Sequence, residues 1–162
     1  MLFKKGYKLS LEVNGEENPD TLKFLANLGN TYGQNGDYDM AFELGQRAYD
    51  LRCRILGPEH PDTLVSVNNL ADAYVGLGEG KKALELLDSC YSSYKRILGS
   101  EHPTTLAIML NLTIMCCVQG KTVKARFLIQ DLYPMAKKAW KPDSEHMVGV
   151  RMIYNRLVGR KT

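Results

Sequence analysis

Apolar residues in the middle of this chain recur at the three- and four-residue spacing of a helix that buries one face. In residues 61–76 these positions are Leu64, Val67, Leu70, Ala71 and Tyr74. Pro61 suits the first turn, where a missing N–H costs nothing, and His60 is then the expected N-cap. Gly78 is expected to end the helix, because glycine tolerates the left-handed conformation found there. A second helix with an apolar side is predicted over residues 79–98.

The same pair of patterns occurs three times with a period of 42 residues. Blocks 15–56, 57–98 and 99–140 align without gaps, and eleven positions are identical in all three. A fixed period of this length indicates stacked supersecondary units that bury their apolar faces against their neighbours. The predicted helix pairs are 19–34 with 37–56, 61–76 with 79–98, and 103–118 with 121–140.

The two ends fit the same register. Residues 1–14 match the second helix of a preceding block, since Tyr7 lies 42 residues before Tyr49. Residues 141–162 are expected to hold one last amphipathic helix, 144–158, that caps the stack. The sequence therefore predicts a single all-α array of eight helices over residues 1–162. An array that begins in mid-repeat favours a fragment of a larger protein over a short natural protein with two half-repeat caps.

One residue departs from the pattern. Pro134 falls inside the second helix of the third block, where it removes an N–H and presses on the carbonyl of Gln130. Interior proline costs a helix about 3 kcal/mol. The third pair is therefore expected to be the least regular, kinked or broken near Tyr133.

The repeated residues carry a resemblance. The pattern N-L-[GA]-x-x-Y-x-x-x-G-x-x-x-x-A-x-x-L, in residues 27–44 and 69–86, resembles that of tetratricopeptide repeat proteins. The 42-residue unit and its L-G-x-E-H-P-x-T-L junction, in residues 56–64 and 98–106, are similar to the long-helix subclass. That subclass is found in kinesin light chains and in sensor arrays of some bacterial and fungal signalling ATPases. The resemblance implies a right-handed α-solenoid of stacked antiparallel helix pairs, and a scaffold that binds a protein or peptide.

Composition indicates the compartment of the protein and disfavours some classes of partner. No run of about 18 apolar residues occurs, so no transmembrane helix is predicted, and no apolar segment of a secretory signal follows the first residues. Four cysteines without framework-like spacing favour reduced thiols and a cytoplasmic location. Residues 1–120 carry 11 Lys and Arg against 15 Asp and Glu, whereas residues 121–162 carry 10 against 3. A solvated basic end is favoured over a nucleic-acid contact, because no aromatic interleaving accompanies the charge.

The chain shows no constellation of residues that would support catalysis. His60, His102 and His146 lie one repeat or more apart, so they are expected to serve as caps or loop residues and not to share a metal. Cys116 and Cys117 are adjacent, which is not the two-apart spacing that lets thiolates share zinc. The sequence therefore predicts no enzyme, no catalytic residue, no metal site and no cofactor.

The resemblance implies that the first helix of each pair lines a concave groove. Carried over position by position, this groove runs from polar and amide-rich residues to apolar ones. Side-chain amides suit an extended peptide backbone, because they both donate and accept hydrogen bonds. Asn27, Asn69 and Asn111 are instead expected to brace the helix pairs. The candidate partner-binding residues are Lys23, Asn30, Gln34, Val65, Asn68, Asp72, Leu110 and Ile114.

Two functions stay open at this point. The groove binds a protein or peptide, or the array is structural or self-associating and its groove is filled by its own tail, another copy or neighbouring domains. The apolar groove of the third block distinguishes them, according to whether residues 141–162 fold into it. The second helices are expected to present mainly charged residues, such as Glu85, Asp88 and Lys95, so no binding is assigned to them. No nucleic-acid or membrane partner is predicted, and a homo-oligomer stays open.

Overall fold

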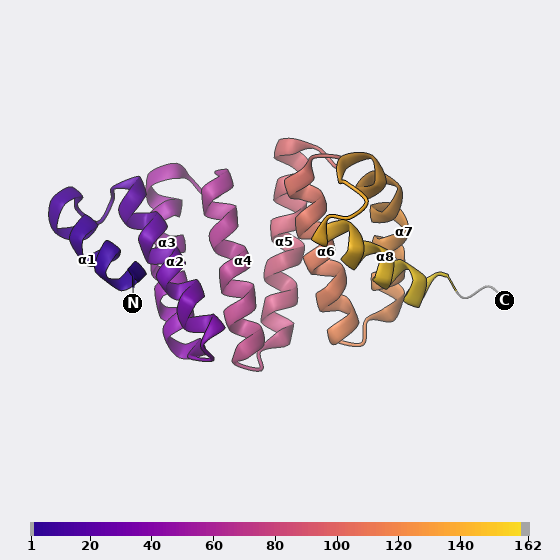
Figure 1. The fold of residues 1–162 in the computed structure, drawn as a ribbon, viewed down its shortest axis with the longest axis horizontal. Coiled ribbons are helices and arrows are strands. Elements are labelled where there is room, and N and C mark those ends of the chain that lie inside the picture. Colours follow the sequence, from indigo (N-terminus) through magenta and orange to yellow (C-terminus); the bar gives the residue numbers. More distant parts are fainter. Residues whose placement is uncertain (1, 160–162) are drawn as a thin grey trace. The chain divides into compact units, whose positions relative to one another are not determined.

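The computed structural model describes residues 2–159 of the chain and shows eight α-helices and no strand in them (Figure 1). These residues fall into two compact units, the first ending at Ala83 and the second beginning at Leu84. The boundary lies inside the fifth helix. The helices are α1 (Leu2–Asn14), α2 (Pro19–Gln34), α3 (Tyr38–Leu56), α4 (Pro61–Gly76), α5 (Gly80–Leu98), α6 (Pro103–Val118), α7 (Thr122–Ala139) and α8 (Glu145–Leu157).

In the first unit, α1 packs on α2, α2 on α3 and α3 on α4, and α2 also contacts α4. Figure 1 shows α2, α3 and α4 side by side in this unit. Ser10 on α1 and Thr21 on α2 share a buried hydrogen bond of 2.7 Å. The core between α2 and α3 is built from repeated apolar positions, namely Leu22, Leu25, Ala26, Leu28, Leu44, Ala48 and Leu51.

In the second unit, α6 packs on α7, and α8 packs on α7 and on α6. The rings of Tyr133 on α7 and Tyr154 on α8 stack with centroids 4.1 Å apart. Lys124 on α7 forms an ion pair of 2.8 Å with Asp88 on α5. The core of this unit consists of Leu106, Met109, Leu110, Ile129, Leu132, Ala136, Met147 and Val150.

The helix starts follow from the junction residues, as the sequence predicts. The Asn18 side chain accepts the N–H of Asp20, and Nδ1 of His60 accepts the N–H of Asp62 at 3.1 Å. His102 caps α6 in the same way. His146 does not cap, because Ser144 precedes it and accepts the N–H of Met147 instead. The His146 ring lies against Trp140, with centroids 4.9 Å apart.

Close approach of α2 and α3 explains the small residue at Gly29. A Cβ there would lie 3.3 Å from Cβ of Leu44 and 3.4 Å from the backbone oxygen of Ala41. Such contacts are tighter than ordinary packing, so a larger side chain would push the two helices apart. A small residue is therefore required at this point of the contact between α2 and α3.

The expected break near Tyr133 is wrong. Helix α7 runs from Thr122 to Ala139 with Pro134 inside it. Leu132 and Ala136, on either side of the proline, are fully buried in the core of the second unit, whereas Pro134 is exposed. Packing on both sides of the proline therefore holds the helix together despite the lost hydrogen bond. A kink at this position stays a prediction.

Candidate functional site

Three of the predicted groove residues come together in the first unit. Asn30 and Gln34 on α2 face Asp72 on α4 across a hollow of about 300 Å³. Asn69 on α4 lines the same hollow. We call this the amide hollow; its remaining lining residues are Gly29, Gly33, Tyr38, Ala41 and Ala73.

The amides in this hollow have unused hydrogen-bonding capacity. Among the described residues, the side chains of Asn30, Gln34 and Asn69 have no hydrogen-bond partner. Each amide supplies two donors and an acceptor with two lone pairs. The amide hollow can therefore both donate to and accept from a segment laid across it.

Asp72 adds a carboxyl group to the amide hollow. The residue is accessible to solvent, but neighbouring atoms displace water from the carboxyl, which raises the pKa of Asp72 above its usual value. A carboxylate that has lost part of its hydration gains from a donor supplied by a ligand, above all a Lys or Arg side chain. Asp72 is thus the one candidate in the hollow that would select for charge.

Asn69 corrects the interpretation of the repeated asparagines. The sequence predicts a bracing role for Asn27, Asn69 and Asn111; this stays a prediction for Asn27 and Asn111, whereas Asn69 lines the amide hollow. The repeat spacing could have identified Asn69 as a candidate, since it lies one helical turn before Asp72. A bracing role is thus not supported for Asn69.

Three other candidates of the first unit lie outside the amide hollow. Lys23 lines a separate hollow between α1 and α2 and pairs with Asp20 at 3.3 Å. Val65 is exposed on α4, and Asn68 beside it is half-buried. Neither the hollow between α1 and α2 nor the amide hollow brings these residues to Asn30 and Gln34.

The prediction that Leu110 lines an open groove is wrong. Leu110 is only 5% exposed and belongs to the core of the second unit together with Met147 and Val150 of α8. A Cβ on Gly149 of α8 would lie 3.9 Å from a methyl group of Leu110. The sequence left this cover open as an alternative, in which residues 141–162 fold into the groove of the third block, because it depends on the tertiary packing of α8. Ile114, one turn further along α6, stays exposed, so the described tail residues cover only part of the apolar face.

The second helix of the third block also exposes apolar residues among its charged ones. On α7, Val123 and Phe127 are largely exposed and line a shallow hollow with Lys121 and Lys124. In the 42-residue register their counterparts are charged, with Asp39 and Lys81 for Val123, and Glu43 and Glu85 for Phe127.

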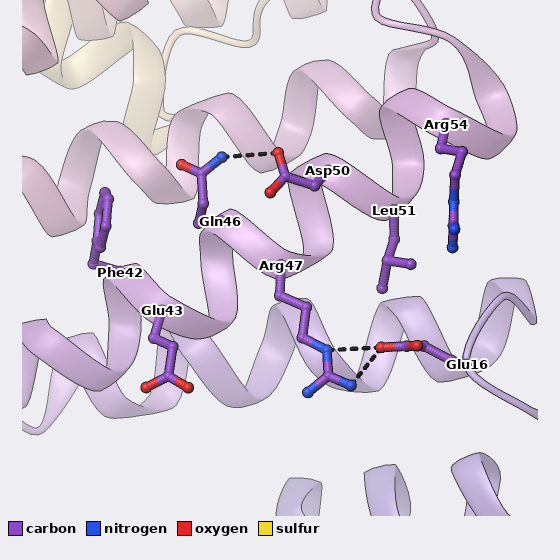
Figure 2. Close-up of a pocket in the computed structure, with 8 residues that line it drawn as sticks. All are labelled: Glu16, Phe42, Glu43, Gln46, Arg47, Asp50, Leu51 and Arg54. Carbon is purple, nitrogen blue, oxygen red and sulfur yellow. Dashed lines mark hydrogen bonds and ion pairs between the residues drawn. The ribbon is translucent and has the colours of Figure 1, made fainter.

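A further hollow, of about 700 Å³, lies along α3 and was not predicted from the sequence (Figure 2). Phe42 and Leu51 supply its apolar part. Part of its polar lining is paired within the hollow, since Nε of Arg47 donates to Glu16 at 2.7 Å. Figure 2 also shows Gln46 donating to Asp50, at 2.9 Å. Because these four polar groups already have partners, they offer a ligand less than the amides of the amide hollow do.

The cysteines do not resemble reactive thiols. Burial raises the pKa of the Cys90 thiol to about 12, and it also raises the pKa of Cys116 and Cys117. A thiol with a raised pKa holds little of the nucleophilic thiolate near neutral pH. Within residues 2–159 no group of three His, Cys, Asp or Glu residues is arranged to hold a metal ion. None of the helices in that range combines the length and apolar character that a membrane crossing requires.

Comparison with known proteins supports the repeat assignment. A family model described as tetratricopeptide repeat matches residues 20–95 and 62–138. No curated protein sequence is significantly similar to the chain. Among solved structures, two crystal structures of kinesin light chain-like, nearly identical TPR-like repeats from Podosopora anserina match 98% of this chain and 77% of theirs. They are 24% identical, with TM-scores of 0.77 and 0.76.

A third structure, BtubC (BKLC) from P. vanneervenii, matches 98% of this chain with 15% identity and a TM-score of 0.79. This chain spans 64% of the length of that protein. At these identities the likeness concerns the fold. Together with the eight helices, it places the chain in the all-α class of repeat solenoids.

Proposed function

Since the chain belongs to the tetratricopeptide repeat family, we propose that it is a non-enzymatic scaffold that binds an extended protein segment in its amide hollow. Repeats of this family support interaction between proteins. The observation that carries the finer proposal is the set of three partnerless amides around Asp72.

The chemistry of the amide hollow suggests the kind of segment it binds. An extended backbone presents alternating N–H and C=O groups, which three side-chain amides can satisfy without reading the sequence. Asp72 favours a segment that carries a Lys or Arg at the position facing it. The first unit as a whole carries 9 Lys and Arg against 12 Asp and Glu, a net charge of −3, which attracts such a segment.

We place this scaffold in the cytoplasm. In the described part of the chain, none of the four cysteines forms a disulfide, which suits a reducing compartment. The alternative function, an array filled by its own tail, draws support from the cover of Leu110 by α8. That cover lies in the second unit, whereas the amide hollow is lined by residues of α2, α3 and α4 in the first unit.

A selection followed by affinity measurement tests the proposal. Random unstructured peptides displayed on phage are selected on the purified chain, and the affinity of the enriched peptides is measured by fluorescence anisotropy. A hydrogen bond to a charged group contributes about 1.5–3 kcal/mol, so we expect Asp72→Asn to weaken binding by about tenfold or more. Asn69→Ala should weaken it by a smaller factor.

The matched control is Gln46→Ala, which removes an amide of the same chemistry from the hollow on α3. We expect it to leave the affinity unchanged. Enriched peptides that bind Asp72→Asn and Asn69→Ala as tightly as the wild type, but lose affinity for Gln46→Ala, would show that the binding surface lies on α3. Circular dichroism of each variant confirms that it is folded.

A further inference from the structure

Helix α1 aligns, in the 42-residue repeat, with the second helix of a block. One of its apolar faces is exposed to solvent in the structure. Leu2 and Leu9 lie 42 residues before Leu44 and Leu51 of α3. On α3 these two leucines are buried in the core against the first helix of their own block. On α1, Leu2 is 82% exposed, Leu9 is 63% exposed and Val13 is 71% exposed.

A hollow of about 610 Å³ lies beside this exposed face, between α1 and α2. Leu9 and Val13 of α1 and Phe24 of α2 form its apolar part. Polar side chains of α2, including Asp20 and Asn27, also line it. The hollow thus has the composition of a site that binds an amphipathic helix, with apolar residues inside and polar residues beside them.

Helix α8, the last helix of the described residues, also has an exposed apolar face. Its N-cap Ser144 stands 42 residues after the N-cap His102, so α8 occupies the register of a first helix. Val148 and Met152 lie three repeats after Leu22 and Ala26, which are buried against α3 in the first unit. On α8, Met152 is 68% exposed and Val148 is exposed as well.

We propose that α8 of one copy packs on α1 of a second copy, so that two half repeats from different copies complete one helix pair. In the first unit, Leu22 and Ala26 of α2 pack with Leu44 and Leu51 of α3. In the proposed contact, Val148 and Met152 of α8 pack in the same way with Leu2 and Leu9 of α1. This inference uses other residues than the amide hollow and does not depend on peptide binding.

Charge favours a contact between unlike ends. The first unit has a net charge of −3, whereas the second unit carries 12 Lys and Arg against 6 Asp and Glu, a net charge of +6. The two units attract each other at long range, but α1 and α8 themselves carry net charges of +2 and +1, so their packing rests on the apolar faces. The interface is heterologous, because the two copies use different surfaces, so each associated copy leaves one end open for a further copy.

Sedimentation velocity of the chain over a wide range of concentration tests the proposal. We expect the wild type to associate with rising concentration, because contact buries the two apolar faces. Leu9→Asp removes the α1 face and Met152→Asp removes the α8 face. Each variant alone should stay monomeric where the wild type associates.

Mixing the two variants is the decisive step. Met152→Asp keeps an intact α1 and Leu9→Asp keeps an intact α8, so the mixture should form a 1:1 dimer that does not grow further. Lys5→Asp is the matched control on α1, because its register partner Arg47 is exposed on α3, and it should associate as the wild type does. Both altered residues are largely exposed, so the variants should fold, and Val13→Asp and Val148→Asp replace any that does not.

Three results would overturn the proposal. The wild type could stay monomeric at every concentration. Leu9→Asp alone could still dimerise, which would indicate contact between two α8 faces, or Met152→Asp alone could do so through two α1 faces. A mixture that stays monomeric, with both variants folded, would show that the two faces do not meet.

Discussion

Arg52 offers a direct test of how one block is joined to the next. Its side chain leaves α3 and is buried, with 5% of the residue exposed. Nη1 donates to Oγ of Ser66 at 2.7 Å and to the backbone oxygen of Asp62 at 2.9 Å, both on α4. Burial lowers the pKa of the Arg52 guanidinium, which shows that the charged group has lost hydration.

The perturbation is Arg52→Met, which keeps much of the apolar stem and removes the donor. A buried polar group left without its partner costs about 1–3 kcal/mol. The substitution leaves Oγ of Ser66 and the backbone oxygen of Asp62 without their donor, but it also removes the cost of burying the guanidinium charge. We therefore expect a net loss of about 1–3 kcal/mol in the free energy of unfolding. Ser66→Ala should cost a similar amount, since it removes a hydrogen bond to a charged group.

The double variant separates the interaction from the two side chains. If Arg52 and Ser66 stabilise the junction through their hydrogen bond, the double variant loses about 1–2 kcal/mol less than the sum of the single losses. The assay is urea unfolding followed by circular dichroism, with the m-value checked for each variant. Arg54→Met is the matched control, because Arg54 pairs with Glu17 at the exposed surface, where an ion pair contributes about 0–1 kcal/mol. Additive single losses, or equal losses for Arg52→Met and Arg54→Met, would refute the reasoning.

Two further predictions concern the cores. Leu70→Ala should lower the free energy of unfolding by about 2–5 kcal/mol, because Leu70 is buried and its side chain lies against Gly45; a loss below about 0.5 kcal/mol in urea unfolding would show that the buried face is misassigned. The Cys90 thiol, whose pKa burial raises to about 12, should react with a disulfide reagent near pH 8 far more slowly in the native protein than in urea, and faster as the pH rises; equal native and unfolded rates would contradict this.

The helix ends were predictable from the sequence because their signals are local. Asn18 and His60 each cap a helix through the N–H two residues further on, and a proline follows each of them. The predicted ranges 19–34, 61–76 and 103–118 are those of α2, α4 and α6. The second helices begin one residue later than predicted, which is within the usual fraying of helix ends.

The sites were less predictable because they depend on tertiary packing. The repeat register placed Asn30 and Asp72 on first helices. It could not show that Asn69 faces them, or that the amides of the hollow lack partners. It left open whether the last helix folds into the apolar groove, and the packing of α8 on Leu110 decides this at that residue. The break at Pro134 failed for a related reason, since intrinsic propensity gave way to burial on both sides of the proline.

The most direct test of the central claim is to observe the amides of the hollow while a segment binds. Side-chain NH₂ resonances of Asn30, Gln34 and Asn69 are followed by nitrogen–proton NMR as a selected peptide is added. Binding in the amide hollow predicts that these three resonances shift together and saturate with one dissociation constant, while that of Gln46 stays in place. Saturable shifts confined to Gln46, with all three unmoved, would contradict it.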